Sequence, residues 1–127
     1  MKVIIAGSRT INNYKIVCKA MAHVEIKPTQ VVSGGARGID VLGVKWAVDH
    51  NVSVRRFYPD WKKLGKRAGP ERNRRMAEYA DFLVAIWDGK SRGTKNMIET
   101  MLKMGKPFIV FKKESERWKI VSKGCLE

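Results

Sequence analysis

The chain has 127 residues, which is enough for one domain with one hydrophobic core. Its hydrophobic fraction of 44% and charged fraction of 30% are typical of a soluble globular protein and exclude the disordered and low-complexity classes. The 26 Lys and Arg residues outnumber the 12 Asp and Glu residues and give a net charge of +14, so we expect an anionic partner.

Short apolar runs of β type alternate with segments of helical periodicity, a pattern typical of βαβ units and a parallel sheet. The five predicted strands are Lys2 to Ala6, Gln30 to Ser33, Val52 to Tyr58, Asp81 to Trp87 and Pro107 to Phe111. The four predicted helices are Asn13 to Val24, Arg37 to His50, Pro70 to Ala80 and Thr94 to Met104, and Trp118 to Val121 favours an additional edge strand. The pattern predicts a single-domain, three-layer α/β fold of Rossmann-like architecture over residues 1–127, with a mainly parallel sheet of five to six strands and helices on both faces.

The N-terminal apolar run, Val3 to Ala6, is far shorter than a signal-peptide core or a membrane span. We therefore expect a cytoplasmic protein without membrane contact. Cys18 and Cys125 lack CxxC spacing, and two histidines are too few to suggest a zinc site. The sequence predicts reduced cysteines, no metal and no cofactor.

Basic residues are concentrated between Arg55 and Arg75, where nine Lys or Arg residues face two acidic residues, a net charge of +7. A solvated surface that keeps the protein soluble and a surface that attracts polyanions are both open interpretations. Tyr58, Trp61 and Trp87 lie near the predicted ligand edge and are candidates for stacking on a base, although core packing is the commoner role of such residues.

Glycine-rich loops follow three predicted strands, at the sheet edge where ligands bind in open α/β proteins. They are Gly7-Ser8-Arg9, Ser33-Gly34-Gly35-Ala36-Arg37-Gly38-Ile39-Asp40 and Asp88-Gly89-Lys90-Ser91-Arg92-Gly93-Thr94. Each leads into a helix whose first amides and dipole favour an anion, and glycine lets a phosphate approach those amides. The sequence predicts a phosphate site, with glycines that only make tight turns as the alternative. Neither GxxxxGK[ST] nor GxGxxG is present, which disfavours ordinary NTPases and NAD dehydrogenases.

Several polar residues near this edge have two interpretations each. Asn73 falls on the buried stripe of the third predicted helix. We expect it either to contact the ligand or to form hydrogen bonds with neighbouring backbone groups. Arg72, together with Lys66 and Arg67 in the preceding loop, is expected to reach over a bound phosphate. Asp40 either accepts a ribose hydroxyl or is favoured by the helix dipole, and Thr94 resembles an N-cap.

Together these segments resemble the SLOG superfamily, which includes the DprA/Smf proteins and the "lonely guy" phosphoribohydrolases, and within it the YspA/YpsA-related branch of small bacterial and phage proteins. The resemblance is carried by Gly7-Ser8-Arg9, Ser33-Gly34-Gly35-Ala36 with Gly38 and Asp40, Trp61 to Gly65, Ala68-Gly69-Pro70 with Arg72-Asn73 and Met76, Ala80-Asp81 and Gly93-Thr94. It implies a nucleotide pocket formed by the loops after the first, second and fourth strands.

The chain departs from the enzymatic branch of this group. That branch carries PGGxGTxxE, whose glutamate takes part in cleaving an N-glycosidic bond. Here Met97 stands at the glutamate position, and Glu99 comes two residues later, between Lys95 and Lys103 at the spacing of a solvated ion-pair ladder. The resemblance therefore implies that the catalytic residue is absent.

The sequence predicts binding, as a sensor or by sequestration, of a phosphate-bearing nucleotide or nucleotide-derived ligand without turnover. We expect a domain that provides no catalytic and no metal-binding residue, and ligand contacts from Gly7, Ser8, Arg9, Ser33, Gly34, Gly35, Ala36, Arg37, Asp40, Lys66, Arg72, Asn73, Asp88, Ser91, Gly93 and Thr94. The alternatives are a nucleotide N-glycosidase and DprA-like binding of single-stranded nucleic acid.

The resemblance also points to a family whose members commonly associate. The fourth predicted helix carries more apolar residues than one narrow stripe needs: Met97, Ile98, Met101, Leu102 and Met104. We therefore expect a homodimer.

Overall fold

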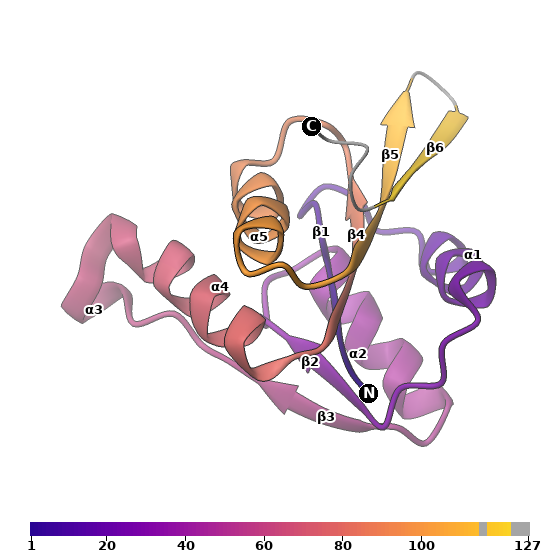
Figure 1. Ribbon diagram of the computed structural model, residues 1–127, viewed down its shortest axis with the longest axis horizontal. Coiled ribbons are helices and arrows are strands. Elements are labelled where there is room, and N and C mark those ends of the chain that lie inside the picture. The colour runs from indigo at the N-terminus through magenta and orange to yellow at the C-terminus, as the bar shows by residue number, and fades with distance from the viewer. Residues whose placement is uncertain (115–116, 123–127) are drawn as a thin grey trace.

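The computed structural model describes residues 1–114 and 117–122 (Figure 1). The strands are β1 (Lys2–Gly7), β2 (Gln30–Ser33), β3 (Ser53–Arg56), β4 (Phe82–Trp87), β5 (Phe108–Glu114) and β6 (Arg117–Ser122). The helices are α1 (Tyr14–Val24), α2 (Ile39–Asp49), α3 (Trp61–Leu64), the 3₁₀ helix η1 (Gly65–Arg67), α4 (Ala68–Tyr79) and α5 (Arg92–Lys103). All nine predicted main elements are present, with ends that differ by a few residues, and the predicted edge strand is β6.

The strands form one sheet in the order β3-β2-β1-β4-β5-β6. The first five are parallel, and β6 pairs antiparallel with β5. The chain moves outward from β1 through β2 to β3 and then crosses back to place β4 on the other side of β1. Strand order therefore reverses between β1 and β4, and the Rossmann-like α/β prediction is confirmed.

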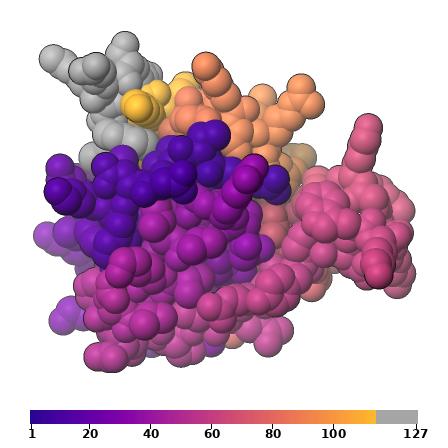
Figure 2. All heavy atoms as spheres, turned by 180° about the vertical axis from the view of Figure 1, so that it is seen from behind, coloured from indigo at the N-terminus to yellow at the C-terminus, as the bar shows by residue number. Residues whose placement is uncertain are grey.

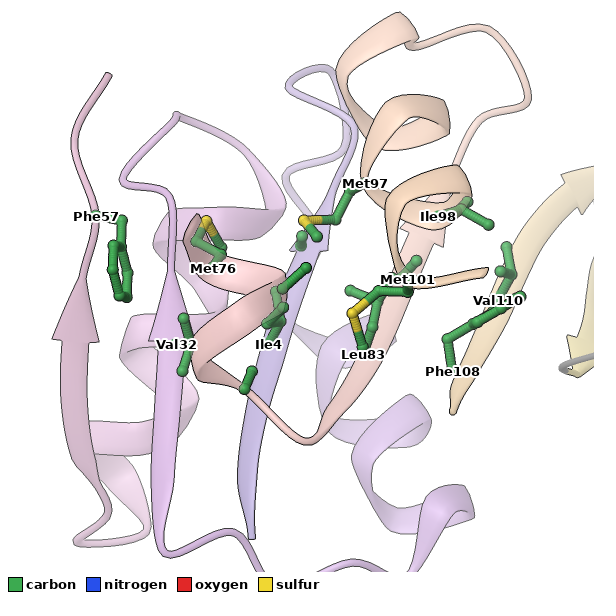
Figure 3. Packing of buried hydrophobic residues seen from close by; sticks show 14 residues of the cluster. Ile4, Val32, Phe57, Met76, Leu83, Met97, Ile98, Met101, Phe108 and Val110 are labelled. Atoms are coloured by element: carbon green, nitrogen blue, oxygen red, sulfur yellow. The ribbon is translucent and has the colours of Figure 1, made fainter. Parts of the chain in front are cut away.

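Helices cover both faces of the sheet, because the inner strands are apolar on both sides. On β1, Val3 and Ile5 belong to the core that α1 and α2 cover, whereas Ile4 and Ala6 belong to the core under α4 and α5. Figure 3 shows the second core, in which the side chains of Met97 and Met101 from α5 lie over the strands. The two cores fix the helices that carry the site.

Local signals in the sequence set several helix ends. The Asn13 side chain accepts a hydrogen bond of 3.0 Å from the Lys15 amide and caps α1. The predicted stop of α5 is confirmed, since Gly105 has a φ of 68° one residue beyond the C-cap Met104. Lys106 then reaches back to the end of α4, where its Nζ donates to three backbone carbonyls, those of Ala77, Glu78 and Ala80, at 2.7, 2.9 and 2.8 Å.

The segment before α4 is the main difference from the sequence prediction, in which this segment is a loop. Residues 61–67 are helical, and α4 begins at Ala68 rather than Pro70. Asp60 caps α3 by accepting from the Lys63 amide at 3.1 Å, and Gly65, with a φ of 55°, ends the short turn. A helix of four residues is too short for its hydrophobic period to be read from the sequence.

The apolar residues of α5 are used mostly within one chain. Met97, Ile98 and Met101 are buried in the core, which leaves Leu102 half-buried and Met104 exposed. Only Leu102 and Met104 of these residues have apolar surface left for a partner subunit. The homodimer stays a prediction.

Three other predictions concern chemistry away from the site. In the described ranges, no helix is long and apolar enough to cross a membrane, and no group of three or more His, Cys, Asp or Glu side chains is placed to hold a metal. Cys18 is a free, half-buried thiol on α1. Cys125 lies outside the described residues.

Candidate functional site

A cavity of about 290 Å³ lies at the switch point of the sheet, where the carboxyl ends of β1, β2 and β4 meet. Its walls come from three loops and from the inner face of α4. The residues that line it are Ala6, Gly7, Arg9, Gly34, Ala36, Asp40, Arg72, Asn73, Met76, Ser91, Arg92, Gly93, Thr94 and Met97. Open α/β sheets bind their ligands at this position, which is the edge that the sequence predicts.

Ten of the sixteen predicted site residues line this cavity: Gly7, Arg9, Gly34, Ala36, Asp40, Arg72, Asn73, Ser91, Gly93 and Thr94. The other six do not line it: Ser8, Ser33, Gly35, Arg37, Lys66 and Asp88. The loops thus converge as expected, whereas the direction of individual side chains differs from the sequence prediction.

Three of the six form the framework beneath the loops. The hydroxyl of buried Ser8 accepts a 3.0 Å hydrogen bond from the Asp88 amide, which joins the loop after β1 to the loop after β4. Asp88 in turn accepts from the amides of Lys90 and Ser91, both at 2.8 Å. Burial acts to raise the pKa of Asp88, but the hydrogen bonds with Lys90, Ser91, Ser8 and Thr10 together outweigh it and lower the pKa. The Ser33 hydroxyl accepts from the Gly35 amide at 3.1 Å.

The remaining three are exposed and lie away from the cavity wall. Gly35 has a φ of 72°, and a Cβ atom there would lie 3.2 Å from Cε1 of Tyr58 rather than in the cavity. Arg37 and Lys66 are exposed, and neither lies on the wall. A side chain at Gly35 would therefore act first through backbone strain and contact with Tyr58.

Asp40 and Arg72 form a buried charged group at the base of the cavity. Asp40 is 5% exposed, and its Oδ2 accepts a 3.2 Å hydrogen bond from the Ala36 amide. Burial raises the pKa of Asp40 to about 6, against the opposing effects of the Ala36 amide and the Arg72 guanidinium. Burial also lowers the pKa of Arg72, and Asp40 opposes that shift.

Arg72 does not reach over the cavity from outside, as the sequence prediction had it. It is buried, its Nη1 donates to the Gly34 carbonyl at 2.6 Å, and its Nε donates to Asn73 at 3.1 Å. The reason is its position on α4, where Arg72 and Asn73 are both buried and Arg72 contacts Gly34 in the loop after β2. A Cβ atom at Gly34 would lie only 2.7 Å from Nη1 of Arg72, so this close approach requires glycine.

Asn73 joins α4 to the start of α5. Its Nδ2 donates to the Gly93 carbonyl at 3.2 Å and to Oδ1 of Asn96 at 3.0 Å, while its Oδ1 accepts from Arg72. The interpretation that Asn73 satisfies neighbouring polar groups is therefore supported. It also lines the cavity, so its contact with a ligand stays a prediction.

The first turn of α5 forms the opposite wall. Ser91 is its N-cap and accepts from the Thr94 amide at 3.5 Å and from the Thr94 hydroxyl at 3.1 Å. Trp87 donates to the Ser91 carbonyl at 3.0 Å and so is committed to supporting this turn. A Cβ atom at Gly93 would meet nothing within 4 Å, so an incoming group can approach the backbone there closely.

Sequence reasoning missed four residues of the wall: Ala6, Met76, Arg92 and Met97. Arg92 belongs to the predicted glycine-rich loop after the fourth strand, and its position in the first turn of α5 is the sequence signal that points to the cavity. Ala6 and Met76 are buried core residues that reach the cavity from below. No local pattern distinguishes them from other core positions.

Comparison with known proteins identifies the family of this chain. The family model of the YspA, cpYpsA-related SLOG family matches residues 1–64, which hold β1, β2 and the loops after them. The chain belongs to this SLOG family. It is 35% identical over 119 residues to the Gene 61 protein of Mycobacterium phage D29, covering 87% of this chain and 95% of that protein. No solved structure matches.

SLOG membership suggests a nucleotide-related function. The residue that stands where the enzymatic SLOG branch has its glutamate is Met97, which is 1% exposed and lies on the cavity wall. Glu99 is exposed and lies beside a separate hollow with Trp87 and Lys95. Within the described residues Glu99 forms no ion pair, so the lysine ladder expected from its spacing is not formed.

Proposed function

We propose that this SLOG protein binds a phosphate-bearing nucleotide or nucleotide-derived ligand in the switch-point cavity and does not turn it over. The observation that carries the proposal is the meeting of the three strand-end loops with the N-terminus of α5 around one cavity of about 290 Å³. That volume is at the lower end of the range for small-molecule sites, about 300–1,000 Å³. A mononucleotide suits it better than a dinucleotide.

The phosphate end of the proposed site is the first turn of α5. Ser91, Arg92, Gly93 and Thr94 all line the cavity, and this helix has 12 residues, so its dipole favours an anion at that turn. Arg92, in this turn, and Arg9, in the loop after β1, are exposed cations that line the same cavity. Their guanidinium groups would donate to phosphate oxygens, with charge-assisted hydrogen bonds that a neutral ligand cannot accept.

The other end of the cavity would hold the nucleoside. Beyond the first turn of α5, the cavity is lined by the buried polar side chains of Asp40 and Asn73 and by the apolar side chains of Met76 and Met97. Asn73 also contacts that turn through the Gly93 carbonyl. A ribose hydroxyl would donate to Asp40, while the base would lie against the methionine side chains, which adapt to varied shapes. This end therefore suits a sugar and a flat base rather than a second phosphate.

The arrangement of carboxylates favours binding over hydrolysis. Breaking an N-glycosidic bond develops positive charge on the ribose, which a placed carboxylate must oppose. Among the described wall residues only Asp40 has a carboxylate, and it is engaged with the Ala36 amide and Arg72. Asp88 is held in the turn before α5, and Met97 is uncharged.

Isothermal titration calorimetry with nucleoside monophosphates, cyclic nucleotides and ADP-ribose-type compounds tests the proposal. Arg9→Ala and Arg92→Ala are expected to weaken the best ligand by about 1–3 kcal/mol each, the usual value of a hydrogen bond to a charged group. Arg37→Ala is the matched control, since it removes the same charge from an exposed site outside the wall. Equal losses of affinity in all three variants would mean that the overall charge of the protein, and not contact with the cavity wall, determines binding.

Chromatography of the same mixtures separates binding from turnover. Nucleotide is expected to remain intact over hours. Free base or ribose phosphate that accumulates in proportion to the protein, and is lost in Asp40→Asn or Asp88→Asn, would show a nucleotide N-glycosidase instead. Absence of binding to every compound would contradict the proposed site altogether.

A further inference from the structure

A basic arm projects from the body of the protein beside the cavity. It consists of residues 58–67, which hold α3 and η1, and it stands out at one end of the molecule in Figures 1 and 2. A hollow of about 750 Å³ lies between the arm and α4, lined in part by Tyr58, Lys63, Arg67 and Arg75. None of these residues lines the switch-point cavity.

The arm carries four of the cations in the basic stretch that no carboxylate of the described residues neutralises. Arg74 is paired with Glu71 and Glu78 on the outer face of α4, and Arg72 is buried beside Asp40. Four cations of the arm, by contrast, are exposed and form no ion pair within the described residues: Lys62, Lys63, Lys66 and Arg67. Their positive charge is directed to solvent, where it attracts a polyanion.

Two large aromatic side chains lie among these cations. Tyr58 is 64% exposed and Trp61 is 53% exposed. Tyr58 is held from both sides, because its carbonyl accepts a 2.9 Å hydrogen bond from Arg75 and its ring lies against Gly35. Trp61 reaches the start of α4, where a Cβ atom at Gly69 would lie 3.6 Å from its ring. Both rings are anchored, yet each keeps half or more of its surface in water.

We propose that this arm is a second binding surface, which binds single-stranded nucleic acid through its phosphates and stacks bases on Tyr58 and Trp61. Lysine and arginine side chains contact a phosphate backbone, and exposed aromatic rings stack on bases that are not already paired. A duplex offers the phosphates without free base faces, and an acidic protein offers negative charge without a flat base beside each charged group. A single strand matches both features of the arm. This second proposal does not depend on which ligand the cavity binds.

Fluorescence anisotropy with a labelled oligothymidylate and an oligouridylate of equal length tests this surface. The double variant Lys62→Glu/Lys63→Glu is expected to weaken both oligonucleotides by about tenfold or more and to reduce the dependence of log Kd on log salt concentration. The matched control is Lys15→Glu/Lys19→Glu, which makes the same charge change at two exposed positions of α1, on the opposite side of the molecule. It should have a much smaller effect.

The aromatic residues require their own variants. Tyr58→Ala and Trp61→Ala should each weaken single strands by about 5- to 100-fold, the usual effect of removing a stacking ring. Tyr58→Phe and Trp61→Phe keep a ring and should retain most of the affinity, which separates stacking from damage to the arm. Binding of either oligonucleotide supports the proposal, and the ratio of the two affinities tells whether DNA or RNA is preferred.

Several results would overturn the proposal. They are an equal loss of affinity in the α1 control, unchanged affinity in both alanine variants, and equally tight binding of a duplex or of polyglutamate. Loss of oligonucleotide binding in Arg9→Ala, with no loss in the arm variants, would place the polymer at the cavity instead.

Discussion

The substitution Asp40→Asn isolates the cost of placing a carboxylate at the base of the cavity. Burial raises the pKa of Asp40 from its ordinary value of 3.8 to about 6, so the folded protein holds this proton more tightly than the unfolded chain. The stabilisation from that proton is fully present below about pH 3.8 and is lost as the pH rises to about 6. At about 1.4 kcal/mol per pKa unit, the loss is roughly 3 kcal/mol.

Asparagine has nearly the shape of the protonated carboxyl and does not titrate. Its amide oxygen can still accept from the Ala36 amide, as Oδ2 of Asp40 does. The stability of Asp40→Asn relative to the parent should therefore rise by roughly 3 kcal/mol between about pH 3.8 and about pH 6 and then stay constant. Urea denaturation of both proteins at a series of pH values measures this difference directly.

A control of opposite sign is available on α2. The pKa of Asp49 is lowered, first by a hydrogen bond from Tyr14 and then by Lys45, so its contribution to stability is present at neutral pH and lost as the pH falls. Asp49→Asn should lose stability relative to the parent at neutral pH, and less in acid. Parallel pH profiles for Asp40→Asn and the parent would refute the argument, because they would mean that Asp40 titrates alike in the folded and unfolded states.

Three further predictions concern packing, capping and assembly. Gly34→Ala should lower the free energy of unfolding in urea by about 1–3 kcal/mol because its Cβ meets a buried guanidinium, whereas the Cβ of Gly93→Ala meets open space. Equal urea midpoints for the two variants would contradict this prediction. Lys106→Met should cost about 1–2 kcal/mol, seen as a lower melting temperature, since it removes three charge-assisted hydrogen bonds at the end of α4. Light scattering should show a dimer that Leu102→Lys or Met104→Lys dissociates, and a monomer mass for the parent protein would refute the dimer.

Much of the fold could be predicted because its signals are local. Apolar runs bounded by glycine, the Asn13 cap and the Gly105 stop each depend on a few adjacent residues, and the elements were predicted at nearly their observed positions. The meeting of the three loops also followed from the sequence, since parallel strands place their carboxyl ends at one edge. The sequence therefore predicts the position of the cavity.

The direction of individual side chains was much less predictable. Arg37 and Lys66 have the charge that a phosphate site needs, yet both are exposed away from the wall, whereas Arg92 lies on it. Arg72 was expected over the ligand and lies beneath the loop, because its partner is a carbonyl 38 residues away. Such contacts depend on how α4 packs against the loop after β2, and no periodicity in the sequence encodes that distance.

Two consecutive residues of α4 hold the two walls of the cavity in place. Arg72 binds the Gly34 carbonyl on one wall, and Asn73 binds the Gly93 carbonyl on the other. Arg72 also donates to Asn73, so a shift of either wall disturbs the contact between them. Because Arg72 is buried and Asp40 acts on it electrostatically, we expect the strength of this network to change with the charge on that carboxylate. The width of the cavity and the stability of the fold therefore depend on the same few hydrogen bonds of Arg72 and Asn73. A ligand that contacts both walls would stabilise the folded protein.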